Sequence, residues 1–117
     1  MADIELMEQA ARAAGLDVHR GEKWQSDMLF RAVPRPNSPL VANVEWNPLT
    51  DDGDALRLAV ALLLDVRHVH GKAHAGMQDE FWCTEAWFPN GAPAAATRRA
   101  ITRAAAALAG AAPGRGR

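Results

Sequence analysis

The sequence predicts an α+β fold in which an antiparallel sheet of three to four strands is packed between helices. Three segments show helical periodicity, and short apolar segments lie between them. The resulting order is helix, strand or strands, helix, hairpin, helix, which favours antiparallel pairing. The 117 residues suffice for one domain. We assign residues 1–111 to a single α+β domain and residues 112–117 to a flexible Pro/Gly/Arg tail.

The first helix is predicted over residues 3–14, with Asp3 as its N-cap and Gly15 as its C-terminal stop. A strand is predicted at residues 28–33. The next segment, residues 34–39, holds three prolines and therefore forms a turn or a semi-rigid loop. Residues 40–46 then return as an edge strand.

The clearest local signal is the start of a second helix. Asn47 and Pro48 mark a turn, Thr50 or Asp51 can cap the helix, and Asp54 is spaced to act as the partner of that cap. We expect this helix to end near residue 63 or 64. Its core-facing side is predicted to consist of Leu56, Ala59, Val60 and Leu63.

The C-terminal half is predicted to hold a hairpin and a helix. Residues 65–70 and 81–88 are the strands, and residues 71–76 form a loose turn region between them. The last helix spans residues 94–109 and is rich in alanine, which has high helix propensity. Its predicted inward residues are Ile101, Ala104, Ala105 and Leu108, and its outward residues are Arg98, Arg99 and Arg103.

Composition narrows the classes of function. The net charge of −1 does not favour a general binder of nucleic acid or of membrane surfaces. Cys83 is the single cysteine, so an internal disulfide is excluded and a reducing cytoplasm is expected. The acidic N-terminus does not resemble a signal peptide. The longest aliphatic stretch, residues 55–66, is too short to span a bilayer.

Histidines and the cysteine form the one cluster with metal-like chemistry. His68 and His70 share a strand face, and His74 follows in the turn. Their spacing matches no standard zinc pattern, so solvated histidines are the favoured interpretation and no cofactor is expected. A nucleophilic Cys83 with a neighbouring histidine is the enzymatic alternative, although a buried cysteine is the commoner case. Its orienting carboxylate would be Asp79, Glu80 or Glu85.

Two other charged groups have structural explanations. Asp51, Asp52 and Asp54 resemble part of a cation loop, but Gly53 is misplaced for such a loop and the distant glutamate does not follow, so helix capping explains them. Arginines gather near the C-terminus and are predicted to form a solvated helix face, with a nucleic-acid surface as the alternative. They are Arg98, Arg99, Arg103, Arg115 and Arg117.

Tryptophans are the remaining signal. Trp82 and Trp87 are an odd number of residues apart, so a regular strand places them on opposite faces. One of them can therefore lie in the core while the other is available to a partner. The alternative is that both are buried in a sheet covered on each face.

Residues 46–60 (Trp-Asn-Pro-Leu-Thr-Asp-Asp-Gly-Asp-Ala-Leu-Arg-Leu-Ala-Val) and residues 95–106 (Ala-Ala-Thr-Arg-Arg-Ala-Ile-Thr-Arg-Ala-Ala-Ala) resemble small proteins of proteobacterial phages and prophages. These proteins are grouped as the phage ABA-sandwich type, and the resemblance covers about residues 46–108. It implies an antiparallel sheet between helices and a phage accessory role. Proteins of that kind often block a host complex, as anti-CRISPR inhibitors of bacterial defence do. The resemblance assigns no role to individual residues.

The leading hypothesis is a non-enzymatic protein in the host bacterial cytoplasm that binds and inhibits a host protein or defence complex. A small metal- or Cys/His-dependent enzyme and a nucleic-acid accessory protein are the alternatives. A homodimer formed through the edge strand at the proline loop, or through the aromatic hairpin face, also fits the pattern. No membrane partner is expected. The expected partner-binding residues are Asp51, Asp52, Asp79, Glu80, Trp82 and Trp87.

Overall fold

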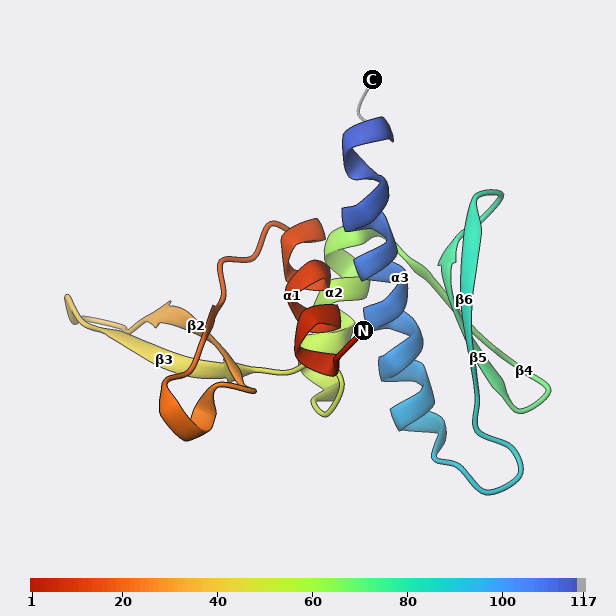
Figure 1. Cartoon of the computed structure of the whole chain (residues 1–117), viewed down its shortest axis with the longest axis horizontal. Helices are drawn as coiled ribbons and strands as arrows, with labels where there is room; N and C mark the ends of the chain where they lie inside the picture. Colours follow the sequence, from red (N-terminus) through yellow and green to blue (C-terminus); the bar gives the residue numbers. More distant parts are fainter. Residues whose placement is uncertain (116–117) are drawn as a thin grey trace.

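The helices of the chain lie between two separate sheets in the computed structural model (Figure 1). The structure describes the backbone of residues 1–115 and the side chains of residues 1–110. The α+β class, with antiparallel strands and packed helices, is confirmed. The strands divide into two three-stranded sheets, where the sequence indicated one sheet of three to four strands. The elements are α1 Asp3–Ala13, β1 His19–Arg20, η1 Lys23–Gln25, β2 Leu29–Pro34, β3 Val41–Trp46, α2 Asp52–Leu62, β4 Asp65–Val69, β5 Lys72–Met77, β6 Phe81–Ala86 and α3 Pro93–Arg115.

The start of α1 differs from the prediction. Asp3 is the first helical residue, and Ala2 is the N-cap. The backbone N–H of Ala2 donates to the Glu5 carboxylate at 3.1 Å. Glu5, in the first turn of the helix, thus satisfies a backbone N–H at the helix N-terminus that has no partner within the helix. Asp3 instead accepts from Arg99 of α3 at 3.0 Å. The aspartate therefore ties the first helix to the last.

The first sheet forms an arm that extends away from the helices (Figure 1). Its order is β1-β2-β3, and β2 and β3 pair antiparallel from Leu29 opposite Trp46 to Pro34 opposite Val41. Leu29 and Trp46 are buried, so the base of the arm belongs to the core while its far end does not. β3 is an edge strand, as predicted. At the base, Arg20 of β1 binds Glu8 of α1 at 2.8 Å, and this hydrogen bond lowers the pKa of the Glu8 carboxyl.

Helix α2 begins as the sequence indicates but faces the other way. Asp51 is its N-cap, and the Asp51 carboxylate accepts the Asp54 backbone N–H at 2.8 Å. The predicted core-facing side is wrong, because Leu56, Val60 and Leu63 are exposed. Of the predicted set, Ala59 alone is buried. The side that packs on the core consists of Asp54, Ala55, Leu58 and Ala59.

The second sheet is a meander of three strands rather than a hairpin. The segment predicted as a turn at residues 71–76 holds all of β5 except Met77, and β5 pairs with both β4 and β6. The connection from β4 is a tight turn through His70 and Gly71, which have φ angles of 52° and 75°. Such paired positive φ angles fit the twist of a two-residue hairpin. The strand was missed because it lacks the β-branched residues that mark most strands.

Helix α3 is the centre of the molecule, with α1, α2 and the second sheet packed on it (Figure 1). Its Ile101, Ala104 and Ala105 are buried as predicted, while Leu108 is half-buried. The helix runs to Arg115, past the predicted end at residue 109. Residues 112–115 of the predicted tail continue this helix, and residues 116–117 lie outside the described residues.

Candidate interaction surface

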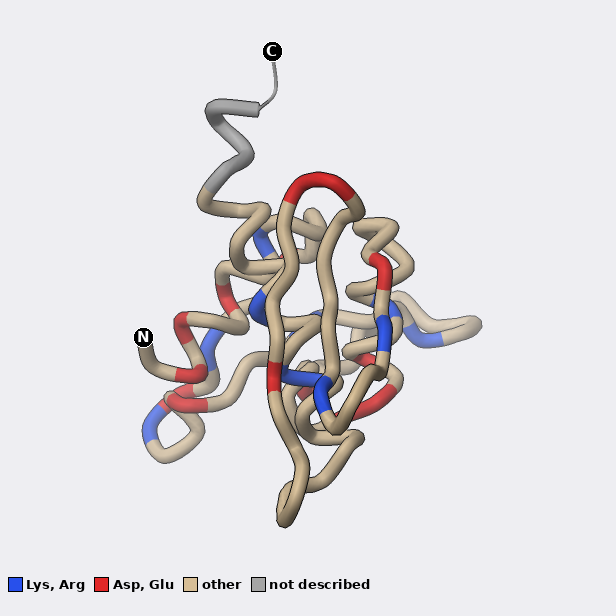
Figure 2. Tube along the Cα trace, turned by 90° about the vertical axis from the view of Figure 1, so that its right-hand side faces the viewer, with Lys and Arg blue, Asp and Glu red and all other residues tan. Residues whose placement is uncertain are grey.

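The acidic residues singled out in the sequence lie at two separate ends of the molecule. Asp51 and Asp52 stand at the N-terminus of α2, where Asp51 caps the helix and Asp52 accepts from Arg98 at 2.7 Å. Asp79 and Glu80 form the acidic turn between β5 and β6, which caps the second sheet in Figure 2. One continuous acidic surface is therefore not formed.

Trp82 and Trp87 occupy opposite faces of the second sheet. This is the predicted arrangement in which one tryptophan packs on the core and the other is accessible. Trp82 points outward, and Arg67 of β4 lies over its ring at 5.1 Å from the centroid. Trp87 is half-buried and packs against the core, with its ring edge-on to His68 at 5.7 Å. Trp82 is thus the accessible member of the pair.

The three histidines do not converge. His68 pairs with Ala73 in the β4–β5 ladder, while His74 pairs with Arg67 and is shifted by one position, which places it on the other face. His68 lies 2.7 Å from the Thr97 hydroxyl and His74 2.8 Å from the Thr84 hydroxyl. His70 is in the turn. Among the residues that the structure describes, no group of three metal-binding side chains comes together.

Cys83 has the surroundings of a structural residue. It is half-buried on the inner face of the second sheet and pairs with Ala75, whereas His74 pairs with the next residue, Thr84, on the outer face. Burial raises the pKa of the Cys83 thiol, and the nearby charge of Arg103 opposes this only in part. A raised pKa favours the neutral thiol, which is a poor nucleophile.

The described C-terminal arginines are all engaged with carboxylates from other elements. Arg98 binds Asp52 at 2.7 Å, Arg99 binds Asp3 at 3.0 Å, and Arg103 binds Glu85 at 2.5 Å. These contacts are explained by packing of α3 against its neighbours. The side chains of Arg115 and Arg117 lie outside the described residues.

An unusual distribution of apolar residues points to a different surface. Among the described residues, ten of the fifteen that form the hydrophobic core are alanines. Large apolar side chains meanwhile remain exposed on α2, where Leu56 and Val60 are each 62% exposed and Leu63 is 81% exposed. The core also contains Leu29, Trp46, Leu58 and Ile101, but the three large side chains on α2 bury little area and so stabilise the fold little. We call Leu56, Val60 and Leu63 the α2 ridge.

Leu63 is also held in a conformation that a leucine seldom adopts. It is the C-cap of α2, with φ 55° and ψ 44°, and glycine is the residue best suited to that position. The left-handed conformation is unfavourable for a residue with a Cβ. An exposed leucine at this position therefore buries little area to offset the cost of its conformation.

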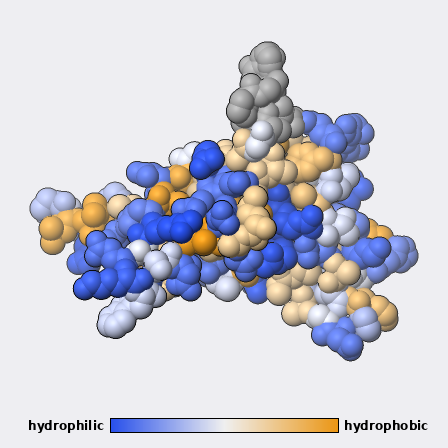
Figure 3. All heavy atoms as spheres, in the orientation of Figure 1, coloured by the Kyte–Doolittle hydropathy of each residue, from blue (hydrophilic) through white to orange (hydrophobic). Residues whose placement is uncertain are grey.

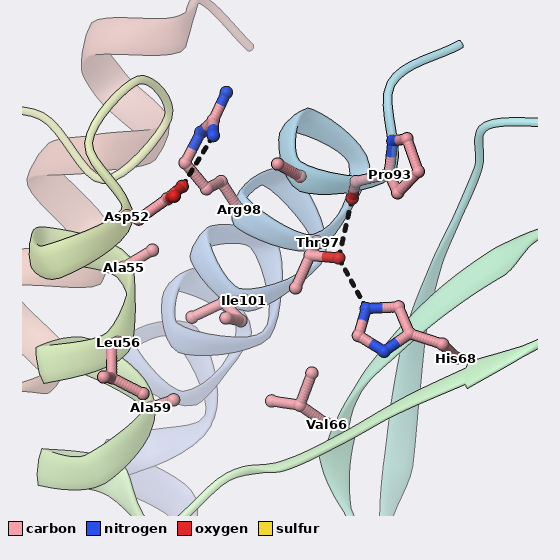
Figure 4. Close-up of a pocket in the computed structure, with 11 residues that line it drawn as sticks. Asp52, Ala55, Leu56, Ala59, Val66, His68, Pro93, Thr97, Arg98 and Ile101 are labelled. Carbon is pink, nitrogen blue, oxygen red and sulfur yellow. Dashed lines mark hydrogen bonds and ion pairs between the residues drawn. The ribbon is translucent and has the colours of Figure 1, made fainter. Parts of the chain in front are cut away.

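An apolar groove of about 390 Å³ runs beside the α2 ridge, between α2, α3 and β4 (Figure 4). Leu56 and Ala59 of α2 face Val66 of β4 and Ile101 of α3 across it. A second pocket flanks the helix on its other side, between α2 and the arm, and contains Val44 and Arg57. The helix thus presents a hydrophobic ridge between two hollows.

The polar groups at the end of the groove serve the fold. The Thr97 hydroxyl donates to the Pro93 carbonyl at 2.7 Å, so the contact from His68 Nε2 to Thr97 is made with the histidine nitrogen donating. Arg98 donates to the Leu49 carbonyl at 2.8 Å and binds Asp52, which fixes the start of α2 against α3. With these groups satisfied, the groove offers shape and apolar surface for binding.

Sequence reasoning missed this surface because it assigned the residues of the ridge to the core. The available signal was the presence of apolar residues on both sides of α2, since Leu58 and Leu62 lie on the side opposite to Leu56, Val60 and Leu63. A helix that is hydrophobic on two sides needs neighbours on both, and among the described residues the side with Leu56, Val60 and Leu63 is left exposed.

Comparisons with protein-family models, curated proteins and solved structures find no match for the chain. The resemblance to phage proteins therefore stays a prediction. In the part of the chain that the structure describes, none of the helices is long and apolar enough to cross a membrane.

Proposed function

We propose that the chain acts by binding another protein through the α2 ridge and the apolar groove beside it. The observation that carries this proposal is the exposure of Leu56, Val60 and Leu63 above a core made mostly of alanine. Full burial of one such side chain contributes about 1.5–3 kcal/mol. The ridge therefore holds enough hydrophobic free energy to anchor a partner.

The shape of the surface favours a partner with protruding apolar side chains. The groove lined by Ala55, Ala59, Val66 and Ile101 accepts such side chains, while the ridge enters a hollow in the partner. Asp51 and Asp52 lie at the N-terminal end of the ridge and remain largely exposed despite their ion pairs. Basic residues at the matching edge of the partner would complement them.

The most specific form of the proposal is a phage accessory protein that inhibits a host protein complex in the bacterial cytoplasm, such as a defence complex. That context depends on the resemblance of residues 46–60 and 95–106. The ridge is compatible with it, because an inhibitor needs affinity for its target and no chemistry of its own. The surface and the context are separate parts of the proposal and are tested separately.

Affinity capture with matched variants tests the surface. The bait chains are the wild type, the double variant Leu56→Glu/Val60→Glu, and Val69→Glu as the control. Val69 is an exposed valine of β4, outside the ridge, so its variant adds the same charge elsewhere. All three should fold alike, because exposed substitutions usually change stability by less than about 0.5 kcal/mol. We expect a host protein that the wild type and Val69→Glu retain and the double variant loses.

A protein retained equally by all three baits would contradict binding through the ridge. Identification of the retained protein then tests the context. A component of a host defence complex supports the inhibitory role, whereas a partner encoded by the phage itself would contradict that role while leaving the binding surface intact.

A further inference from the structure

In the part of the chain that the structure describes, the outer edge of β3 is a second surface without a neighbouring strand, and it is independent of the α2 ridge. β3 ends the first sheet, in the order β1-β2-β3. Natural sheet edges are usually short or carry charges and prolines that prevent pairing with another chain. The edges at β1 and β4 follow this rule, because β1 has two residues and β4 carries Asp65 and Arg67. β6 has six residues and one charge, but Arg103 of α3 covers its edge by donating to the Thr84 carbonyl at 3.1 Å and to Glu85. β3 has six residues and a single charge, on Glu45.

The hydrogen-bond pattern shows which backbone groups face this edge. Arg35 N donates to the Leu40 carbonyl where β2 turns into β3. Hydrogen-bonded pairs in an antiparallel ladder recur at every second residue. In the observed register, Val33 and Ala42, Arg31 and Val44, and Leu29 and Trp46 are therefore the bonded pairs. The N–H and C=O groups of Val41, Asn43 and Glu45 consequently point away from β2, toward the free edge.

These outward groups are complementary to themselves. In an antiparallel pairing of two β3 strands about a two-fold axis at Asn43, Asn43 faces its own copy and Val41 faces Glu45 of the second copy. Each of these pairs can exchange both backbone hydrogen bonds, so every outward group is used. On the other face of the sheet, Ala42 comes opposite Val44 of the second copy, which pairs a small apolar side chain with a larger one.

Exposed apolar residues continue this surface along the arm. Leu40 is 64% exposed, Val41 56% and Val44 43%. Figure 3 shows hydrophobic side chains gathered at the far end of the arm, away from the helices. Pairing of two arms would remove part of this surface from water and end the exposure of the strand edge.

We propose that two copies of the chain pair through β3 to form one continuous six-stranded sheet with its two-fold axis at Asn43. The axis is perpendicular to the sheet, so both copies present the same face to the same side. Val44 and Glu45 of β3 both line the pocket beside α2, so α2 lies beside the base of this strand. A two-fold axis perpendicular to the sheet keeps the two α2 ridges on the same side of it, where they can engage a partner together.

Charge reversal at the axis provides the test. Molecular mass is measured by analytical ultracentrifugation from micromolar to millimolar concentration for the wild type, Asn43→Lys, Asn43→Glu and an equal mixture of the two variants. Ala32→Lys is the control, because Ala32 is exposed on the same face, opposite Asn43 on β2, and one strand away from the axis. The wild type and the control should dimerise, each variant alone should dimerise more weakly, and the mixture should recover the dimer.

Two results would overturn the proposal. One is a wild type that stays monomeric at the highest concentration. The other is a dimer that both Asn43 variants retain and that Leu56→Glu/Val60→Glu abolishes, since this would assign self-association to the ridge. A monomeric wild type would leave capture of a host protein by the ridge untouched, whereas the second result would place self-association on the ridge itself, so the two failures can be told apart.

Discussion

The carboxylate of Asp54 fastens the turn that precedes its own helix, because its Oδ2 accepts the backbone N–H of Asn47 at 2.9 Å. Its Oδ1 binds Arg57 at 2.7 Å, and its side chain is almost fully buried. Asn47 in turn accepts from the backbone N–H groups of Leu49 and Thr50. This network sets the direction in which α2 leaves β3.

We expect Asp54→Ala to lower the free energy of unfolding by about 1–3 kcal/mol, because it leaves a part-buried N–H without its acceptor. Asp54→Asn should recover part of the loss, since the amide oxygen can still accept. Asp52→Ala is the control, because Asp52 is exposed and its removal should have a much smaller effect. Urea denaturation gives all three values, and equal losses in Asp54→Ala and Asp52→Ala would contradict this role of Asp54.

Gly76 is required by the close approach of β5 and β6. A Cβ at this position would collide with the Phe81 carbonyl oxygen and lie 2.9 Å from Trp82 Cα, and both are backbone atoms that cannot rotate away. Gly76→Ala should therefore destabilise the fold by about 1–3 kcal/mol. Gly110→Ala, in α3, meets no described atom within 4 Å and should stabilise by about 0.5–1 kcal/mol. Thermal unfolding of both variants distinguishes steric conflict from a general intolerance of alanine.

The thiol of Cys83 should react slowly at neutral pH. Burial raises its pKa, so less thiolate is present than in an ordinary cysteine, and alkylation should accelerate only at a higher pH. The measurement is the rate of reaction with iodoacetamide against pH, with the unfolded chain in denaturant as the reference. A midpoint in the folded protein below that of the unfolded chain would instead indicate an activated cysteine and revive the enzymatic alternative.

The parts of the fold that depend on residues close together in the sequence could be predicted from the sequence. The turn at Asn47 and the cap at Asp51 are local, because each uses a backbone group within a few residues. The opposite faces of Trp82 and Trp87 likewise follow from the alternation of a strand. The division into two sheets is not local, since it depends on which strands α3 separates.

The candidate surface could not be predicted because it depends on the packing of α2. Ala55 and Leu58 define one apolar side of the helix, and Leu56 and Val60 define another. Helical periodicity weighs these sides by hydrophobicity and so selects the leucine and valine side. In the structure, α3 is rich in alanine and packs closely against the small side, which leaves the larger residues outside.

Leu63→Gly separates the effect of Leu63 on binding from its effect on folding. The substitution should weaken binding of the partner but raise the stability of the fold. Glycine tolerates the φ angle of 55° at this position, so the variant should raise the free energy of unfolding by about 1 kcal/mol. It also removes the most exposed side chain of the α2 ridge.

The measurement that tests the central claim most directly is the affinity of the captured host protein for Leu63→Gly, compared with the wild type by calorimetry. Our account predicts binding weakened by about ten-fold or more, which corresponds to the loss of one buried leucine, in a variant that is more stable than the wild type. Unchanged affinity in that more stable variant would contradict the assignment of the α2 ridge as the binding surface.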